Sequence, residues 1–280
     1  MASKFHEETC DHLLLQGTPA DYLDTPVLGL ENKALLGDRQ VMLQILRDAT
    51  PLPTTVAREG YYDERHLEYW LSGLRDMRKV VTATSLEKAQ APSILDFGGA
   101  SGRVIRHFVG WKPRIALYLS DINPQHILLA KQMFGGAVTA IHNYGLPALP
   151  FPDGCLDCVV AFSVLTHIDT DDTAWLLELR RVVRPGGHLY CTIHDQATWS
   201  ILPQTVIASL SFSDAEFQRY YSSNPELTGR KVHIYNDAVE YACNVFIGRD
   251  YIDRVWAPLF NGYSIVPLAH DHQTALILRV

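Results

Sequence analysis

From Ile94 onward, short apolar runs alternate with stretches in which apolar residues recur every three or four positions. The runs are ILDF, IALYLSDI, AVTAIHN, LDCVVAFSVL and HLYCTIH, and their near-continuous hydrophobicity is typical of parallel strands buried on both faces. Between them lie GRVIRHFVG, PQHILLAKQMF and DDTAWLLELRRVVRPGG, which have helical spacing. This alternation predicts an α/β fold in which helices cover both sides of a parallel sheet.

The chain ends on a helical pattern, RDYIDRVWAPLF, followed by two more apolar runs, GYSIVPLA and TALILRV. Only HDHQ separates the two runs. Because a parallel connection needs a crossover of about a dozen residues or more, we expect these last two strands to pair antiparallel.

Before residue 90 the pattern is helical, over ENKALLGDRQVMLQILRDAT and then over YYDERHLEYWLSGLRDMRKVVTATSLEKAQ, with TPLP between them. We therefore expect an N-terminal helical lid or cap over residues 1–90 and an α/β domain over residues 91–280. Residues 196–247 lack a regular period, and we interpret them as an insertion that shapes a substrate pocket.

The composition is that of an ordinary globular protein, with 47% hydrophobic residues, 20% charged residues and a formal net charge of −7. This balance does not favour nucleic acid as the main partner, because nucleic-acid binding usually requires a basic face. We find no signal peptide and no apolar stretch of about eighteen residues, so we expect no membrane partner. The odd number of cysteines, five, fits reduced thiols in a cytoplasm.

Two short patterns invite a metal or redox interpretation. Cys155 and Cys158 form a CxxC, but there is no second CxxC and the pair leads into a predicted strand, so we interpret both as structural cysteines. His270 and His272 are a weak metal signal without a third located ligand. We therefore expect no metal site.

The first strand of the α/β region runs into a turn with little side chain, ILDFGGASGR. Ligands of parallel α/β sheets bind at the carboxyl ends of the strands, where small residues let the backbone approach them. Asp96 and Gly98, Gly99 and Gly102 lie in this turn, and Asp121 ends the next strand, where a carboxylate can bind ribose hydroxyls.

The turn does not fit a dinucleotide. In the GxGxxG fingerprint read from Gly98, Ala100 and Arg103 stand where glycines are required. The carboxylate of Asp96 would face phosphate there, whereas it suits a cationic ligand such as S-adenosylmethionine, which has an ammonium and a sulfonium group. We expect Ala100 to be tolerated with a negative φ and its methyl group directed away from the ligand.

Four blocks in order resemble the class I S-adenosylmethionine-dependent methyltransferases. DFGGASG is similar to their Asp/Glu-x-Gly-x-Gly-x-Gly motif, with Ala100 at the middle glycine, and YLSDINP, LPALPFPDGCLDCVVAFSVLTHI and LRRVVRPGGHLYCTI look like their later blocks. The resemblance covers residues 94–195 well and 248–280 loosely. It implies a Rossmann-like, doubly wound, seven-stranded sheet with an antiparallel terminal hairpin. It also implies S-adenosylmethionine as the cofactor and S-adenosylhomocysteine as its product.

The resemblance also implies which residues touch the cofactor. Its amino acid part would lie near Asp96 and the backbone around Gly98, its ribose on Asp121, and its adenine against Ile122. The remaining cofactor-binding residues implied are Gly99, Ala100, Gly102, Asn143 or Tyr144 near the adenine amine, and Phe162 and Ser163 beside the methyl group. As alternatives, Asp121 could cap the helix that begins at Pro124 and Asn143 could be a turn residue.

Methyl transfer to a hydroxyl requires alignment of the acceptor and removal of its proton, for which a neutral imidazole near its normal pKa is suitable. His194 and His167 follow predicted strands and are the candidate bases. Other candidates face the substrate: Tyr61 and Tyr62 before the long helix, Tyr221 and His233 in the insertion, and His270 and His272 in the terminal hairpin.

The N-terminal helical region and the late FIGRDYIDRVW block look like bacterial methyltransferases linked to sugars, polysaccharides or secondary metabolites. We therefore expect O-methylation of a small hydroxylated acceptor in the cytoplasm, and leave homodimer formation open. The alternatives are an N- or C-methyltransferase on a small molecule or peptide, a partner subunit that keeps the fold without turnover, and a nicotinamide oxidoreductase.

Overall fold

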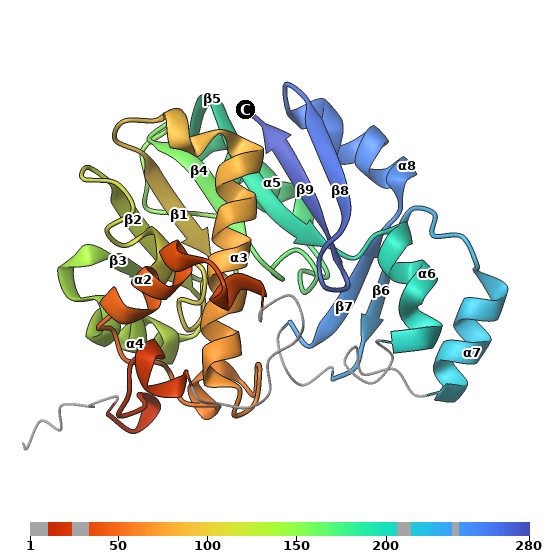
Figure 1. Ribbon diagram of the computed structural model, residues 1–280. Helices are drawn as coiled ribbons and strands as arrows, with labels where there is room; N and C mark the ends of the chain where they lie inside the picture. Colours follow the sequence, from red (N-terminus) through yellow and green to blue (C-terminus); the bar gives the residue numbers. More distant parts are fainter. Residues whose placement is uncertain (1–10, 24–33, 206–213, 237–240) are drawn as a thin grey trace, which may run out of the picture. The chain divides into compact units, whose positions relative to one another are not determined.

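The computed structural model describes residues 11–23, 34–205, 214–236 and 241–280. It contains a seven-stranded sheet with the order β3-β2-β1-β4-β5-β9-β8 (Figure 1). The strands are β1 (Ser93–Phe97), β2 (Ala116–Asp121), β3 (Thr139–His142), β4 (Leu156–Ala161), β5 (Val183–Ile193), β8 (Tyr263–His270) and β9 (Gln273–Arg279). The predicted Rossmann-like α/β fold is therefore confirmed.

The strand directions follow the sequence pattern. β3 runs parallel to β2, and β4 runs parallel to both β1 and β5. β9 pairs antiparallel with β5 and with β8, so the predicted antiparallel terminal hairpin is confirmed. The turn between β8 and β9 is tight, and Asp271 in it has a φ of 54°.

The chain divides into two compact units. The first comprises Met1–Lys79, Gly99–Pro113 and Leu117–His142, and the second comprises Val80–Gly98, Arg114–Ala116 and Asn143–Val280. This division follows spatial contacts and cuts across the sequence, whereas the cap and domain boundary near residue 90 stays a prediction.

In the first unit, the predicted helical patterns form α2 (Arg39–Arg47) and the long α3 (His66–Thr84). The part of the earlier pattern before residue 34 lies outside the described residues. α2 begins after the cap Asp38, whose carboxylate accepts the Gln40 amide proton. The apolar faces of the two helices bury a common cluster that includes Val41, Ile45, Leu67, Trp70, Leu71 and Leu74.

α4 (Pro124–Phe134) begins at proline as expected, whereas two other predicted helices differ in the structure. The GRVIRHFVG stretch contains only a short 3₁₀ helix, Ile105–Phe108, because its amides bond three residues back, as Val109 does to Arg106. α5 (Asp172–Val182) ends before Arg184 and Pro185, which continue as the start of β5. Proline disfavours helical backbone in the residue before it and lacks an amide proton, which explains the earlier end.

The insertion is more regular than its sequence indicates. It contains α6 (Gln196–Thr205), α7 (Asp214–Ser223) and a two-stranded antiparallel sheet of β6 (Arg230–Ile234) and β7 (Cys243–Ile247) (Figure 1). Trp199, Leu202, Leu227 and Phe246 form its buried hydrophobic cluster. Parts of the predicted insertion, residues 206–213 and 237–240, lie outside the described residues.

The helix expected over RDYIDRVWAPLF is a composite: α8 (Arg249–Tyr251), a π-helical turn (Ile252–Trp256) and a 3₁₀ turn (Ala257–Leu259).

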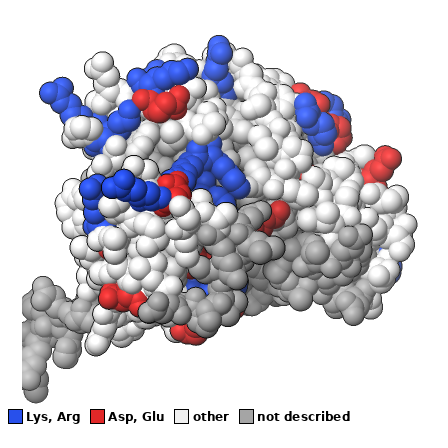
Figure 2. Space-filling view, in the orientation of Figure 1, with Lys and Arg blue, Asp and Glu red and all other residues white. Residues whose placement is uncertain are grey.

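In Figure 2, Lys and Arg side chains lie beside Asp and Glu side chains in several places on the visible face. No helix among the described residues is long and apolar enough to cross a membrane.

Candidate active site

The turn after β1 adopts a left-handed backbone at three positions, Gly98 among them. Gly102 has a φ of 72° and Ala100 a φ of 45°. The expectation that Ala100 would have a negative φ is therefore wrong. The turn keeps a conformation that glycine adopts freely, and an alanine there carries strain of about 1 kcal/mol.

Asp121 holds this turn in place at the carboxyl end of β2. Its Oδ2 accepts a hydrogen bond from the Ala100 amide at 2.9 Å, and its Oδ1 accepts one from the Asn123 amide at 2.8 Å. The cap of α4 is Asn123, which accepts from the Gln125 amide, so the alternative that Asp121 is the helix cap is wrong. Because each carboxylate oxygen has two lone pairs, Asp121 retains acceptor capacity for hydroxyl groups.

Helix α3 supports the same turn from the N-terminal region. The Tyr69 hydroxyl lies 2.9 Å from the Ser101 hydroxyl, and Arg103 donates to Asp76 at 2.6 Å. Both members of this ion pair are largely buried. Although burial lowers the pKa of Arg103, the charge of Asp76 outweighs it, so the guanidinium stays charged.

Tyr61 and Tyr62, predicted to form a lid, lie in the first unit before α3. Their rings make an edge-to-face contact at 4.9 Å, and the Arg103 guanidinium lies 5.7 Å from the Tyr61 ring centroid. Tyr61 is half exposed. This exposure leaves its ring accessible, while the lid itself stays a prediction.

His126, a residue that the sequence pattern did not single out, flanks Asp121. Its Nδ1 lies 3.4 Å from Asp121 Oδ1 and its Nε2 3.5 Å from Glu59 Oε1. Burial lowers the pKa of His126, but the carboxylates of Asp121 and Glu59 outweigh this effect and raise the pKa above its ordinary value. The net charge around Asp121 therefore depends on pH.

The candidate adenine contacts differ in exposure: Ile122 and Tyr144 are exposed, whereas Asn143 is buried. Ile122 is 39% exposed and Tyr144 is 71% exposed, so both present apolar surface. In the second unit, Asn143 is buried; its amide nitrogen donates to the Tyr144 carbonyl, and its amide oxygen has no hydrogen-bond partner among the described residues. A buried amide oxygen of this kind can accept from an amine of a ligand.

In the second unit, the strand ends of β1 and β4 lie close together. Asp96 is buried and pairs in register with Val160. Gly98 has a φ of 67°, and a Cβ atom there would lie 2.4 Å from the Val164 side chain. The glycine at this position is thus required by both backbone conformation and packing.

Ser163, which follows β4, links three segments through hydrogen bonds. Its backbone has a φ of 57°, its amide donates to the Thr192 hydroxyl at 2.7 Å, and its hydroxyl donates to Gln273 Oε1 at 3.0 Å. Phe162 beside it packs on the ring of His270. A strained non-glycine residue held by such partners is a common feature of functional sites.

His194 lies at the centre of a histidine cluster after β5. It is 1% exposed, its ring lies 5.2 Å from Phe246 and 5.5 Å from His272, and its Nε2 lies 3.4 Å from Gln273 Nε2. Burial lowers its pKa well below the ordinary value, His272 and His167 lower it further, and the Val245 backbone opposes them. The expectation of a base near its normal pKa is therefore wrong for His194: its pKa lies well below that value, and the imidazole stays neutral at physiological pH.

The other candidate histidines have distinct surroundings. Nδ1 of His167 lies 2.7 Å from the Cys243 carbonyl oxygen, so it carries the proton. His270 is buried and its Nε2 lies 2.6 Å from the Tyr190 hydroxyl. His272 joins the His194 cluster, and burial lowers its pKa despite the opposing charge of Asp271. The structure thus brings His194 and His272 together and places His270 in a separate buried pair.

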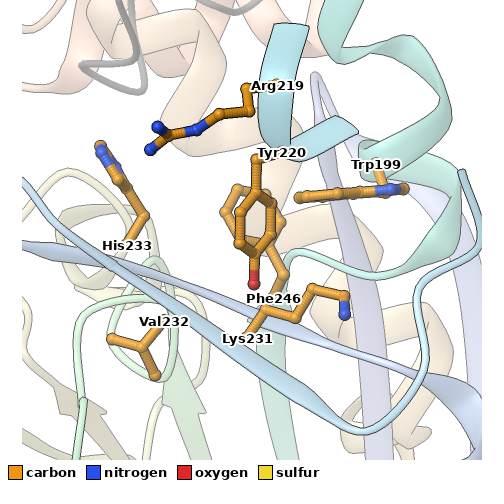
Figure 3. A pocket seen from close by; sticks show the side chains of 7 residues that line it. All are labelled: Trp199, Arg219, Tyr220, Lys231, Val232, His233 and Phe246. Carbon is orange, nitrogen blue, oxygen red and sulfur yellow. The ribbon is translucent and has the colours of Figure 1, made fainter. Parts of the chain in front are cut away.

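His233 and Tyr221 of the insertion have different surroundings. His233 lines a pocket together with aromatic and basic side chains, shown in Figure 3. Tyr221 packs against Trp199 in the hydrophobic cluster, with ring centroids 5.7 Å apart. The sequence pattern missed most of this pocket, as well as Gln273, because the contributing residues lie far apart along the chain.

The CxxC pair does not have the surroundings of a reactive site. Cys158 is fully buried, and burial raises the pKa of its thiol. Cys155 is exposed, but partial loss of solvent around its thiol still raises the thiol pKa. Within the ranges that the structure describes, no three His, Cys, Asp or Glu side chains are grouped so as to hold a metal.

Comparison with known proteins shows similarity to methyltransferases. Residues 95–191 match a family of methyltransferase domains. The chain is 31% identical over 157 residues to the ubiquinone/menaquinone biosynthesis C-methyltransferase UbiE of Hahella chejuensis, covering 47% of this chain and 59% of that protein. UbiE of Chromobacterium violaceum is 27% identical over 172 residues, covering 54% of this chain and 67% of that protein. The chain thus spans about 48–67% of the length of the first curated relatives that it matches.

Solved structures show the same fold. The 1,6-didemethyltoxoflavin-N1-methyltransferase of Burkholderia thailandensis, solved with 1,6-didemethyltoxoflavin and S-adenosylhomocysteine, has a TM-score of 0.50, 16% sequence identity and 92% coverage of both chains. A carbon methyltransferase, CurJ, also has a TM-score of 0.50, with 16% identity, 87% coverage of this chain and 58% of that one. At this identity the likeness establishes the fold.

Proposed function

We propose that the chain is a class I, S-adenosylmethionine-dependent methyltransferase that acts on a small molecule, because residues 95–191 match a family of methyltransferase domains and the fold is that of such enzymes. The observation that carries this proposal is the turn after β1, whose backbone is held by the Asp121 carboxylate inside the matched domain. Such a turn offers backbone groups and a ribose-binding acid to the cofactor.

We assign the cofactor contacts to residues of this chain. When bound, S-adenosylmethionine supplies an electrophilic methyl group on a sulfonium. Asp121 would bind its ribose hydroxyls, the backbone of residues 96–102 its amino acid part, and Ile122 its adenine. The buried oxygen of Asn143, which has no partner among the described residues, fits the adenine amine.

His194 is our candidate for the base. A neutral imidazole with a lowered pKa is fully available as a proton acceptor at pH 7, although it is a weaker base than an ordinary histidine. The side-chain amide of Gln273 can donate a hydrogen bond to Nε2 of His194. If this amide rotates away, an acceptor hydroxyl can donate to Nε2 instead. His272 and His167 remain the neighbouring alternatives.

The acceptor atom has two candidates. Removal of a proton from a hydroxyl supports O-methylation, the outcome that the sequence led us to expect. The relatives named as C-methyltransferases favour carbon instead. Deprotonation of a phenol serves both outcomes, because the phenolate carries negative charge on its oxygen and on ring carbons.

Calorimetry and turnover test the proposal together. We expect S-adenosylhomocysteine to bind and NAD not to bind. We expect His194→Gln to lower kcat by about 10²–10⁴-fold with little change in cofactor affinity. His188→Gln, in the middle of the strand β5 that precedes His194, is the matched control. Magnetic resonance of the product distinguishes a methoxy group from a C-methyl group.

Three results would contradict parts of this assignment. NAD binding without S-adenosylhomocysteine binding would exclude methyl transfer. Full activity of His194→Gln would remove His194 as the base. Cofactor binding without turnover on phenols, sugars and amines would favour the partner-subunit alternative. We further expect a cytoplasmic protein without nucleic-acid or membrane partners, and light scattering would decide between monomer and homodimer.

A further inference from the structure

The insertion encloses a pocket of about 180 Å³ that four of its elements build. α6 and β7 contribute buried rings, α7 contributes an exposed ring and a cation, and β6 contributes two basic side chains (Figure 3). The residues that this inference uses are Trp199, Phe246, Tyr220, Arg219, Lys231 and His233.

The aromatic side of the pocket is rigid at its base and open at its edge. Trp199 and Phe246 are each 1% exposed, and their rings meet edge to face at 5.0 Å. The Trp199 indole donates to the Asn224 carbonyl at 2.8 Å, which fixes its orientation. Tyr220 is 46% exposed and lies 6.2 Å from Trp199. These rings offer edges and faces to a planar aromatic ligand.

The polar side of the pocket is cationic. The Lys231 ammonium lies 5.9 Å from the centroid of the Tyr220 ring. Among the residues that the structure describes, neither Arg219 nor Lys231 forms an ion pair, and no carboxylate lines the pocket. By contrast, Arg230, the neighbour of Lys231, pairs with Asp172 at 3.6 Å.

The orientation of the basic groups favours an anion. In Figure 3 the guanidinium of Arg219 and the ring of His233 point toward one another, on the side of Tyr220 away from Trp199. A guanidinium presents paired donors that match a carboxylate or phosphate, and an ammonium adds a point charge. An acidic group between these side chains would neutralise charge that the described protein groups leave uncompensated.

Phe246 connects the pocket to the candidate base. Its ring lies 5.0 Å from Trp199 in the pocket and 5.2 Å from His194 in the histidine cluster. A ligand that rests on Phe246 therefore lies one side chain away from His194. Phe246 thus lies between the pocket and His194, as it would if the pocket held the part of the acceptor that points away from the reacting atom.

We propose that this pocket binds the methyl acceptor, and that the acceptor is an aromatic compound carrying an acidic group. This inference rests on the proposed methyl transfer. The ring would pack against Trp199, Tyr220 and Phe246, and the acidic group would bind Arg219 and His233, while Lys231, on the other side of Tyr220, adds a second positive charge to the pocket. The pocket is large enough, since a cavity of about 150 Å³ accommodates a benzene ring.

Three matched compounds separate ring from charge. Salicylate has both features, salicylamide lacks the charge, and 2-hydroxycyclohexanecarboxylate lacks the aromatic ring. Each is titrated calorimetrically into the full chain in the presence of S-adenosylhomocysteine. We expect salicylate to bind at least about tenfold more tightly than either analogue, because a charged hydrogen bond and ring stacking each contribute that much.

Variants locate the binding. We expect Arg219→Gln to weaken salicylate by about tenfold, Lys231→Gln to weaken it less, and both to leave salicylamide unchanged. Tyr220→Leu should weaken both aromatic compounds. The controls are Arg254→Gln, an exposed arginine outside the pocket, and Tyr263→Leu, a tyrosine of β8 outside the pocket. The controls should leave all three affinities unchanged.

The titration of S-adenosylhomocysteine in the same samples separates the two proposals. If it does not bind, the methyl transfer is contradicted and the acceptor assignment falls with it. If it binds, and salicylate binds no better than salicylamide, only the present inference is overturned. Unchanged salicylate affinity in both Arg219→Gln and Lys231→Gln would overturn it as well.

Discussion

In the turn of residues 99–103, backbone amides meet a single carboxylate, whereas in the insertion pocket side chains from four elements converge. The turn is short in sequence and is held by Asp121 and by α3. The pocket brings together residues that lie far apart in the sequence, from Trp199 to Phe246. The first arrangement suits a ligand common to many enzymes, because backbone groups change little with sequence. The second suits an acceptor specific to this chain, because each lining side chain can vary independently.

This difference between the turn and the pocket predicts that mutations in one will affect cofactor binding and mutations in the other will affect acceptor binding. Changes to the Asp121 carboxylate that holds the turn should affect stability and cofactor affinity together. Changes at Arg219, Lys231 or Tyr220 should affect acceptor affinity alone, since these side chains are exposed or half-buried. The following experiments test the turn side of this comparison.

The largest effect is expected from Asp76→Ala, which leaves the Arg103 guanidinium buried without its partner. We expect the free energy of unfolding, measured with urea, to fall by about 3–5 kcal/mol. Asp153→Ala is the control, because Asp153 is 84% exposed in its pair with Arg181 and should contribute less than about 1 kcal/mol. Equal losses in the two variants would show that α3 does not stabilise the turn.

Asp121→Asn should come next. The amide keeps one acceptor oxygen for the backbone but loses the charge, so we expect S-adenosylhomocysteine affinity to weaken by about 1–3 kcal/mol in calorimetry. Asp253→Asn, a partly exposed acid near α8, is the matched control. Unchanged affinity in a variant that melts at the wild-type temperature would show the ribose assignment wrong.

The pH dependence of stability tests the contact between His126 and Asp121. The pKa of His126 is raised in the folded protein, so its stabilising contribution is present below the unfolded pKa and is lost as pH rises through the folded value. We expect the difference in unfolding free energy between wild type and His126→Gln to shrink as pH rises from slightly acid to slightly alkaline. A difference that grows over this range would contradict the assigned contact.

The smallest effect is expected from Ala100→Gly. Glycine relieves the left-handed strain at this position but adds freedom to the unfolded chain, so we expect a gain of about 0–1 kcal/mol in urea unfolding. Cofactor affinity should not change, because the Ala100 amide that bonds Asp121 is kept. A destabilised Ala100→Gly variant would show that the alanine methyl group makes a packing contact of its own.

Prediction from sequence succeeded where a pattern is local. The buried strands were visible as apolar runs, and the short HDHQ connection identified the antiparallel hairpin that β8 and β9 form. The motif DFGGASG and Asp121 pointed to the cofactor end because each lies at the carboxyl end of a strand. The two helices and the small sheet of the insertion were not predicted, because their sequences have no clear hydrophobic period.

The sequence alone therefore determined the order of strands and helices, the cofactor class that the turn resembles, and the acid that ends β2. Only the tertiary structure decided the left-handed backbone of Ala100, the neutral state of His194 and the convergence of Arg219, Lys231 and the aromatic rings. The reason is physical: hydrophobic periodicity and turn chemistry act over a few residues. Backbone strain, burial of an imidazole and the meeting of distant side chains depend on the packing of the folded chain.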